Sequence, residues 1–149
     1  MKKFLLAVLL LTGTVYAKAQ TPITWSFTAK KTADKTYEIH MTATLTGHWH
    51  LYSQTQPDDA IAVPTSFDIT TNPLLTLTGK IKEVGTMEKF KDEKLGISAN
   101  QYSGKVDFVQ VVKLKTNIKT NYAGVVEYQI CNDEKCLPPK KVTFSVALQ

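Results

Sequence analysis

Apolar and polar residues alternate with a period of two along most of the chain. Every second residue from Tyr37 to Leu45 is apolar, and the same pattern runs from Val142 to Leu148. Because the side chains of a strand point alternately to its two faces, this pattern predicts strands with one buried face. Further strands are expected over residues 23–30, 48–53, 65–71, 74–84, 105–115 and 122–130.

Turn-forming residues separate the predicted strands, and no ten-residue window shows a helical period. The turn signals are Pro57-Asp58-Asp59, Pro64, Asn72-Pro73, Gly104 and Pro138-Pro139. About eight short strands in a chain of one-domain length favour an all-β fold, an immunoglobulin-like antiparallel β-sandwich. A small closed barrel is the structural alternative. We expect a single domain over residues 20–149.

One predicted strand is apolar on both faces. In residues 105–115, Val109 and Val111 lie on the face opposite to Phe108 and Val112. A strand that is buried on both sides has this composition. The pattern therefore predicts that this segment is a central strand of its sheet.

The segment 86–101 does not follow the alternation. Its apolar residues Met87, Phe90 and Leu95 lie among closely spaced charges of both signs. We expect a loop here, and a loop of this length in a compact domain is usually functional or disordered. A solvated surface loop or a short helical turn is the alternative.

The first residues have the layout of a secretory signal peptide. Lys2 and Lys3 precede an apolar run over residues 4–11, and Ala17 and Ala19 form a small-x-small site. The run is shorter than the roughly 20 apolar residues of a membrane-spanning helix. We expect export and cleavage after Ala19; cleavage after Ala17 and an uncleaved N-terminal anchor are the alternatives.

The charge of the chain changes when this segment is removed. All 18 basic residues are lysines, and loss of the three that lie in residues 1–19 lowers the formal net charge from +5 to +2. The chain contains no arginine, whose planar guanidinium is preferred for phosphate and base recognition. We therefore expect no nucleic-acid partner, and export permits the two cysteines to be oxidised.

The two cysteines, Cys131 and Cys136, flank a short polar segment. Tyr128 and Ile130 fit the core face of the preceding strand, so parity predicts Cys131 on the polar face with an accessible sulfur. Cys136 precedes Leu137 and two prolines, which favours a loop or a sheet edge. Four intervening residues allow a turn that brings the Cα atoms within disulfide range.

The spacing leaves three kinds of chemistry open. It favours a structural bridge over thiol–disulfide exchange, and exchange over a metal site. A zinc site would need the cysteines together with His48 and His50, but turn and surface positions are the more common place for such histidines. Asp133 and Glu134 should raise a thiol pKa and Lys135 should lower it, so no strongly acidified thiol is expected.

These residues resemble a known family. The segment CNDEKCLPPK over residues 131–140, after a strand rich in Val and Tyr, resembles the active-site hairpin of the DsbD N-terminal periplasmic domain. The segment from Gly47 to Tyr52 resembles that family's segment ending in His-Leu-Tyr. Tyr102, which precedes the predicted strand 105–115, also fits the family pattern. The resemblance covers about residues 22–148.

The resemblance implies a thiol:disulfide interchange domain with an immunoglobulin-like fold. Cys131 and Cys136 would be the cycling pair, and Phe90 is the candidate for the cap-loop aromatic residue that shields the disulfide. The implied partners are thioredoxin-fold proteins and a membrane-embedded reductase. We expect a periplasmic monomer with no cofactor, no metal and no small-molecule substrate.

Two features depart from the family pattern. Family members often hold five residues between the cysteines, and this chain holds four. The sequence ends at Gln149 without a membrane-spanning region or a thioredoxin-like domain, so electrons are expected to arrive in trans. The alternative is a non-catalytic exported binding or assembly module whose disulfide is structural.

Overall fold

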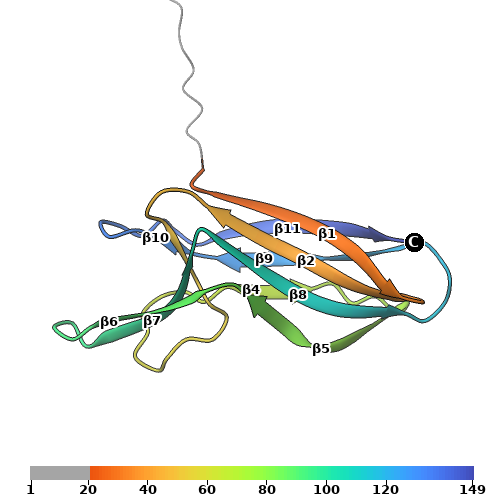
Figure 1. Ribbon diagram of the computed structural model, residues 1–149, viewed down its shortest axis with the longest axis horizontal. Helices are drawn as coiled ribbons and strands as arrows, with labels where there is room; N and C mark the ends of the chain where they lie inside the picture. The colour runs from red at the N-terminus through yellow and green to blue at the C-terminus, as the bar shows by residue number, and fades with distance from the viewer. Residues whose placement is uncertain (1–20) are drawn as a thin grey trace, which may run out of the picture.

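The computed structural model describes residues 21–149, which form antiparallel strands throughout (Figure 1). The eleven strands are β1 (Ile23–Ala33), β2 (Thr36–Leu45), β3 (His50–Tyr52), β4 (Ser66–Ile69), β5 (Leu75–Val84), β6 (Met87–Asp92), β7 (Ile97–Ser103), β8 (Lys105–Leu114), β9 (Thr120–Tyr128), β10 (Ile130–Cys131) and β11 (Lys140–Leu148). Within this range no helix has the length and apolarity needed to cross a membrane. The expected signal peptide, residues 1–19, lies outside the described residues.

The strands form three sheets. Sheet A has the order β1-β2-β8-β5, sheet B the order β10-β3-β7-β6, and sheet C the order β11-β9-β4. The apolar faces of sheets A and C meet in one core, in which Ile39, Phe108 and Tyr122 are fully buried. The predicted all-β, immunoglobulin-like antiparallel sandwich is confirmed.

The alternation of apolar residues explains the body of this sandwich. In β2, every second residue from Tyr37 to Leu45 is buried, and β11 buries Phe144, Val146 and Leu148. The prediction for the segment 105–115 is also confirmed, because β8 lies between β2 and β5.

Sheet B lies at the end of the molecule opposite the C-terminus (Figure 1). Three of its strands continue strands of the sandwich: β3 follows β2, β7 precedes β8, and β10 follows β9. Gly104, at a φ of 69°, forms the corner between β7 and β8, where a left-handed conformation favours glycine. Sheet B is therefore an extension of the sandwich body.

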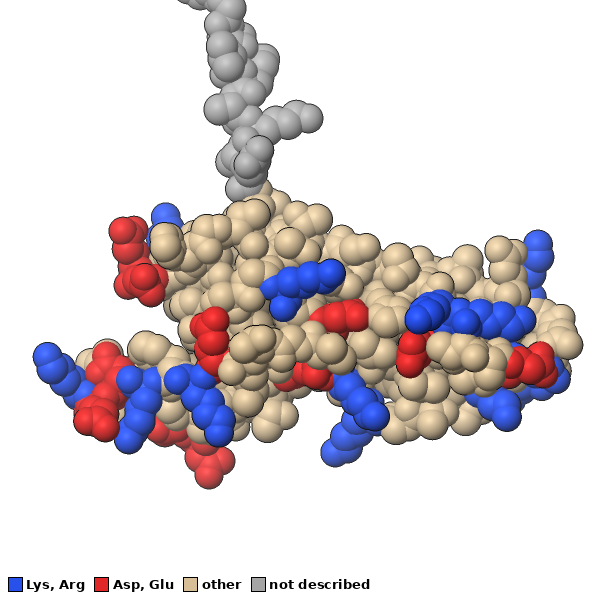
Figure 2. Space-filling model, in the orientation of Figure 1, with Lys and Arg blue, Asp and Glu red and all other residues tan. Residues whose placement is uncertain are grey.

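The expected loop over residues 86–101 is wrong. The segment forms the β6–β7 hairpin, in which Glu88 pairs with Gln101 and Phe90 with Ala99. β6 is exposed along most of its length, so its positions carry charges and the apolar alternation is missing there, whereas β7 buries Ala99 and Tyr102. On the face drawn in Figure 2, acidic and basic side chains are interspersed at this end of the molecule.

Candidate functional site

The two cysteines form a disulfide at the junction of sheets B and C. Their Cα atoms are 4.0 Å apart, and the two residues pair as an isolated antiparallel bridge. The turn between them is closed by Asn132, whose Oδ1 accepts hydrogen bonds from the amides of Glu134 at 3.0 Å and Lys135 at 2.8 Å. Sequence reasoning did not single out Asn132, although Asn is typical of such turns.

The predicted accessibility of the Cys131 sulfur is wrong. Cys131 is only 2% exposed, whereas Cys136 is exposed. The parity argument failed because β9 ends at Tyr128 and the chain then crosses to sheet B, where Ile130 and Cys131 are both buried. Cys131 is covered by Tyr52 and Ala99, with the partly buried Ala62 against them. A thiolate from another molecule would therefore meet Cys136 first.

The two faces of sheet B have different roles. Across one face, Ile130 pairs with Leu51, which pairs with Tyr102, and all three belong to the main core. Across the other face, Cys131 lies opposite His50. Cys131 and His50 thus lie on the outer face of sheet B, and the inner face fixes that sheet to the sandwich.

A cavity of about 490 Å³ opens on this outer face. Both cysteines line it, and so does Phe90, which is 45% exposed. Ile61 and Ile97 add apolar surface at the same cavity. The structure thus brings the cap-loop candidate Phe90 and the disulfide to one cavity, although Phe90 belongs to a strand and not to a loop.

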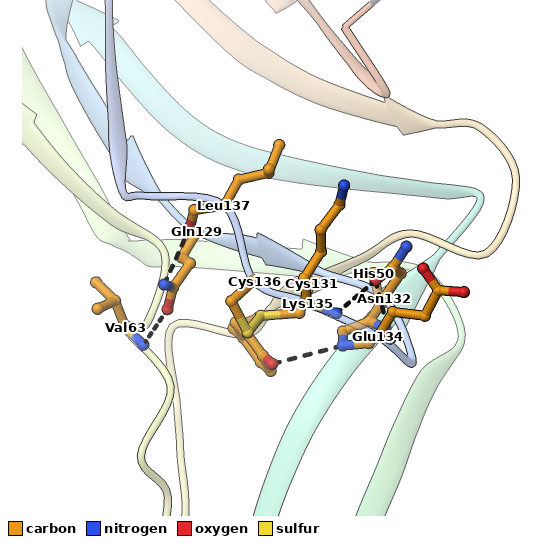
Figure 3. Close-up of a disulfide and its surroundings, with 10 residues drawn as sticks. His50, Val63, Gln129, Cys131, Asn132, Glu134, Lys135, Cys136 and Leu137 are labelled. Atoms are coloured by element: carbon orange, nitrogen blue, oxygen red, sulfur yellow. Dashed lines mark hydrogen bonds between the residues drawn. A yellow bond between two sulfur atoms is a disulfide. The ribbon is translucent and has the colours of Figure 1, made fainter.

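Polar contacts hold the segments around the disulfide. The Gln129 side chain accepts a hydrogen bond from the amide of Val63 at 3.2 Å and donates one to the carbonyl of Leu137 at 3.1 Å (Figure 3). Gln129 thus ties the segment before β4 to the residue that follows Cys136. The sequence did not predict this bridge. A polar residue at the end of a strand is common, so Gln129 gave no signal that its side chain joins two other segments.

A second set of hydrogen bonds is centred on Glu83 of β5, which does not line the cavity. Glu83 accepts hydrogen bonds from the hydroxyl of Ser53, the amide of Gln54 and the hydroxyl of Tyr102, at 2.6–2.7 Å. Tyr102, which fits the family pattern, therefore fixes β7 to β5. Its side chain does not line the cavity. Tyr128 is a core residue, 5% exposed.

The two histidines of the candidate zinc site, His48 and His50, have different positions. His50 lines the cavity, and its Nε2 lies 3.4 Å from the hydroxyl of Tyr52. Burial lowers the pKa of His50, while Asp133 and Glu88 act in the opposite direction. His48 is exposed in the preceding turn and lies outside the cavity. Among residues 21–149, no group of three or more His, Cys, Asp or Glu side chains could hold a metal ion.

Comparisons with known proteins give a family match for this chain. Residues 18–148 match the family described as thiol:disulfide interchange protein DsbD, N-terminal. No curated protein sequence matches the chain.

The solved structures that are similar to the chain include two N-terminal domains. The reduced DsbD N-terminal domain of Neisseria meningitidis is 17% identical, with a TM-score of 0.49 over 77% of this chain and 78% of that one. The N-terminal periplasmic domain of ScsB from Proteus mirabilis is 16% identical, with a TM-score of 0.51 over 85% of this chain and 44% of that one. The second likeness shows a shared fold. From the family match over nearly its whole length, the chain belongs to the family of DsbD N-terminal domains.

Proposed function

We propose that this protein is an exported thiol–disulfide exchange domain that relays electrons through Cys131 and Cys136 to or from thioredoxin-fold partners. The observation that carries the proposal is an exposed Cys136 joined to a buried Cys131 at the wall of an open cavity. Exchange requires a sulfur that an incoming thiolate can reach, and the exposure of Cys136 supports this role.

The exchange step follows from this accessibility. A partner thiolate attacks Sγ of Cys136, so a partner–Cys136 disulfide forms and the Cys131–Cys136 bond breaks. Cys131 leaves as a thiolate and takes up a proton. The second thiol of the partner then attacks its own sulfur in the mixed disulfide, which releases Cys136. Two electrons and two protons pass to this protein, and the partner is left as a disulfide.

Trapping of the mixed disulfide tests the proposal. Cys131→Ala leaves Cys136 without its internal partner. After activation of Cys136 with dithiobis(nitrobenzoate), this variant should form a stable mixed disulfide with a thioredoxin-fold protein that keeps only its first active-site cysteine, seen by mass spectrometry without reductant. The matched variant Cys136→Ala should trap far less, because its remaining thiol is buried. The proposal thus gives the trapping role to Cys136, whereas the parity argument predicted the accessible sulfur at Cys131. If neither folded variant forms the adduct, the proposal fails.

The alternative is a binding or assembly module with a structural disulfide. The burial of Cys131 and the hydrogen-bonded turn at Asn132 favour that alternative. A redox titration of the pair separates the two. Structural disulfides lie below roughly −300 mV, whereas an exchange pair lies at a higher potential.

The cellular setting belongs to the same proposal. We propose a periplasmic monomer that is released by cleavage after Ala19 and receives electrons from a membrane-embedded reductase. The mass of the mature protein checks the cleavage site. Light scattering at the concentration used for the exchange assay checks the monomeric state.

A further inference from the structure

A buried sulfur that takes part in exchange must gain and lose a proton. Cys131 is 2% exposed and lies under Tyr52 and Ala99. Burial in apolar surroundings disfavours a thiolate. The thiolate is nevertheless the species that attacks a mixed disulfide on Cys136. A group beside Cys131 that accepts the proton would lower this barrier.

His50 has the position that such a group requires. It lies directly opposite Cys131 in the β3–β10 pair, where Cβ atoms are about 4.5–5.5 Å apart and the two side chains share a face. Both residues line the cavity (Figure 3). The Tyr52 hydroxyl lies 3.4 Å from Nε2 of His50, and Tyr52 also packs against Cys131.

The groups around His50 keep it able to accept a proton. Burial lowers its pKa below the usual 6.5, so the ring is mostly neutral at pH 7. Two carboxylates act on it, Asp133 from the turn between the cysteines and Glu88 from β6. From β7, the opposing residue is the uncharged Ser103. The carboxylates would stabilise the imidazolium once it forms.

We propose that His50 is the general base that accepts the proton of the Cys131 thiol when the pair closes to a disulfide, assisted by the Tyr52 hydroxyl. The inference rests on the proposed exchange function. In this step the Cys131–Cys136 bond forms and the bond from Cys136 to its partner sulfur breaks. The partner leaves as a thiolate, and the proton stays on the imidazole. In the reverse direction the imidazolium protonates the departing Cys131 thiolate.

The reaction of the reduced protein with dithiobis(nitrobenzoate) isolates this step. Cys136 attacks the reagent first and releases one coloured thiolate at a rate proportional to the reagent concentration. Cys131 then attacks the mixed disulfide and releases the second thiolate at a rate independent of that concentration. Stopped-flow absorbance between pH 5 and pH 9 gives both rates.

The expected result is a selective effect of His50→Gln. At pH 7 this variant should slow the second phase by about 10- to 100-fold, within the range of general-base contributions, and leave the first phase within about twofold. Tyr52→Phe should slow the second phase by a smaller factor. His48→Gln, the same change at an exposed position two residues away, should leave both phases unchanged.

Two results would overturn the inference: a second phase in His50→Gln that matches the unsubstituted protein, or an equal slowing of both phases. If the unsubstituted folded protein shows no first phase, the exchange function itself fails. The unsubstituted protein supplies a further check if the variant does not fold. Its second phase should decline at acid pH with the same midpoint as the His50 ring, titrated by NMR in the reduced protein, and different midpoints would overturn the inference.

Discussion

The sandwich body and the disulfide end of this protein are built in different ways. In the body, all strands except β4 have nine to eleven residues and bury aromatic rings such as Phe108, which lies 5.8 Å from Trp25 and 5.1 Å from Phe67 between ring centroids. In sheet B the strands have two to seven residues, and Cys131 is covered by Tyr52 and Ala99, with the partly buried Ala62 against them.

This difference separates stability from reactivity. Apolar burial in the body supplies most of the free energy of folding, since that free energy grows with the apolar area removed from water. The disulfide end is held to the body by core residues of its inner face, such as Leu51, and by the polar contacts of Gln129 and Glu83, and it leaves Cys136 exposed. Substitutions in the two regions should therefore change different properties.

The largest effect is expected for a truncation in the body. Phe108→Ala removes a fully buried ring between two other aromatic side chains. We expect the free energy of unfolding to fall by about 3–5 kcal/mol, from lost transfer energy and a cavity. Urea denaturation measures this loss. A loss below about 1 kcal/mol would contradict the assignment of stability to the body.

Opening the disulfide should cost less than that truncation. A bridge between Cys131 and Cys136 closes a short loop, for which chain entropy predicts about 2 kcal/mol. Urea denaturation of the oxidised and the reduced protein gives the difference. If reduction unfolds the protein, the disulfide end would hold the fold together, and the comparison above would be reversed.

A second substitution tests the polar contacts of Glu83. Glu83→Gln replaces a carboxylate that accepts three hydrogen bonds with an amide that cannot accept all of them. We expect a loss of about 1–2 kcal/mol in the free energy of unfolding. Glu127→Gln, at a carboxylate that faces the exposed Lys141, should change it by less than about 1 kcal/mol. Equal losses would show that the Glu83 contacts add nothing specific.

Removal of the aromatic ring above the cavity should change reactivity with little change in stability. Phe90→Ala should increase the rate of disulfide reduction by glutathione several-fold, because the ring lines the cavity with both cysteines. Stability should change by about 0.5 kcal/mol or less, since Phe90 is 45% exposed. Leu95→Ala, in the turn of the same hairpin and outside the cavity, is the control. An unchanged rate would remove Phe90 from the site.

The smallest effect concerns pH. Because burial lowers the pKa of His50 in the folded protein, the unfolded chain binds the proton more readily. The stability contribution of neutral His50 is therefore present above pH 6.5 and is lost as the pH falls through the lower folded pKa. The melting temperature of the protein relative to His50→Gln should thus decline between pH 7 and pH 5. A relative rise would reverse the assigned direction.

The sequence alone determined the sandwich body and identified the disulfide pair. Strict alternation in residues 37–45 and 142–148 predicted β2 and β11, because a strand with one buried face needs an apolar residue at every second position. The short polar segment between Cys131 and Cys136 also predicted a turn that allows a disulfide. These are local properties, so neighbouring residues in the chain are enough to reveal them.

Only the tertiary structure decided how the site is assembled. The β6–β7 hairpin was missed because the exposed strand β6 carries charges at positions that would be apolar in a half-buried strand. Cys131 is buried because the chain changes sheets at Gln129, and His50 lies beside it because β3 pairs with β10. These placements depend on pairing between segments about 80 residues apart, and alternation within each segment carries no information about its partner.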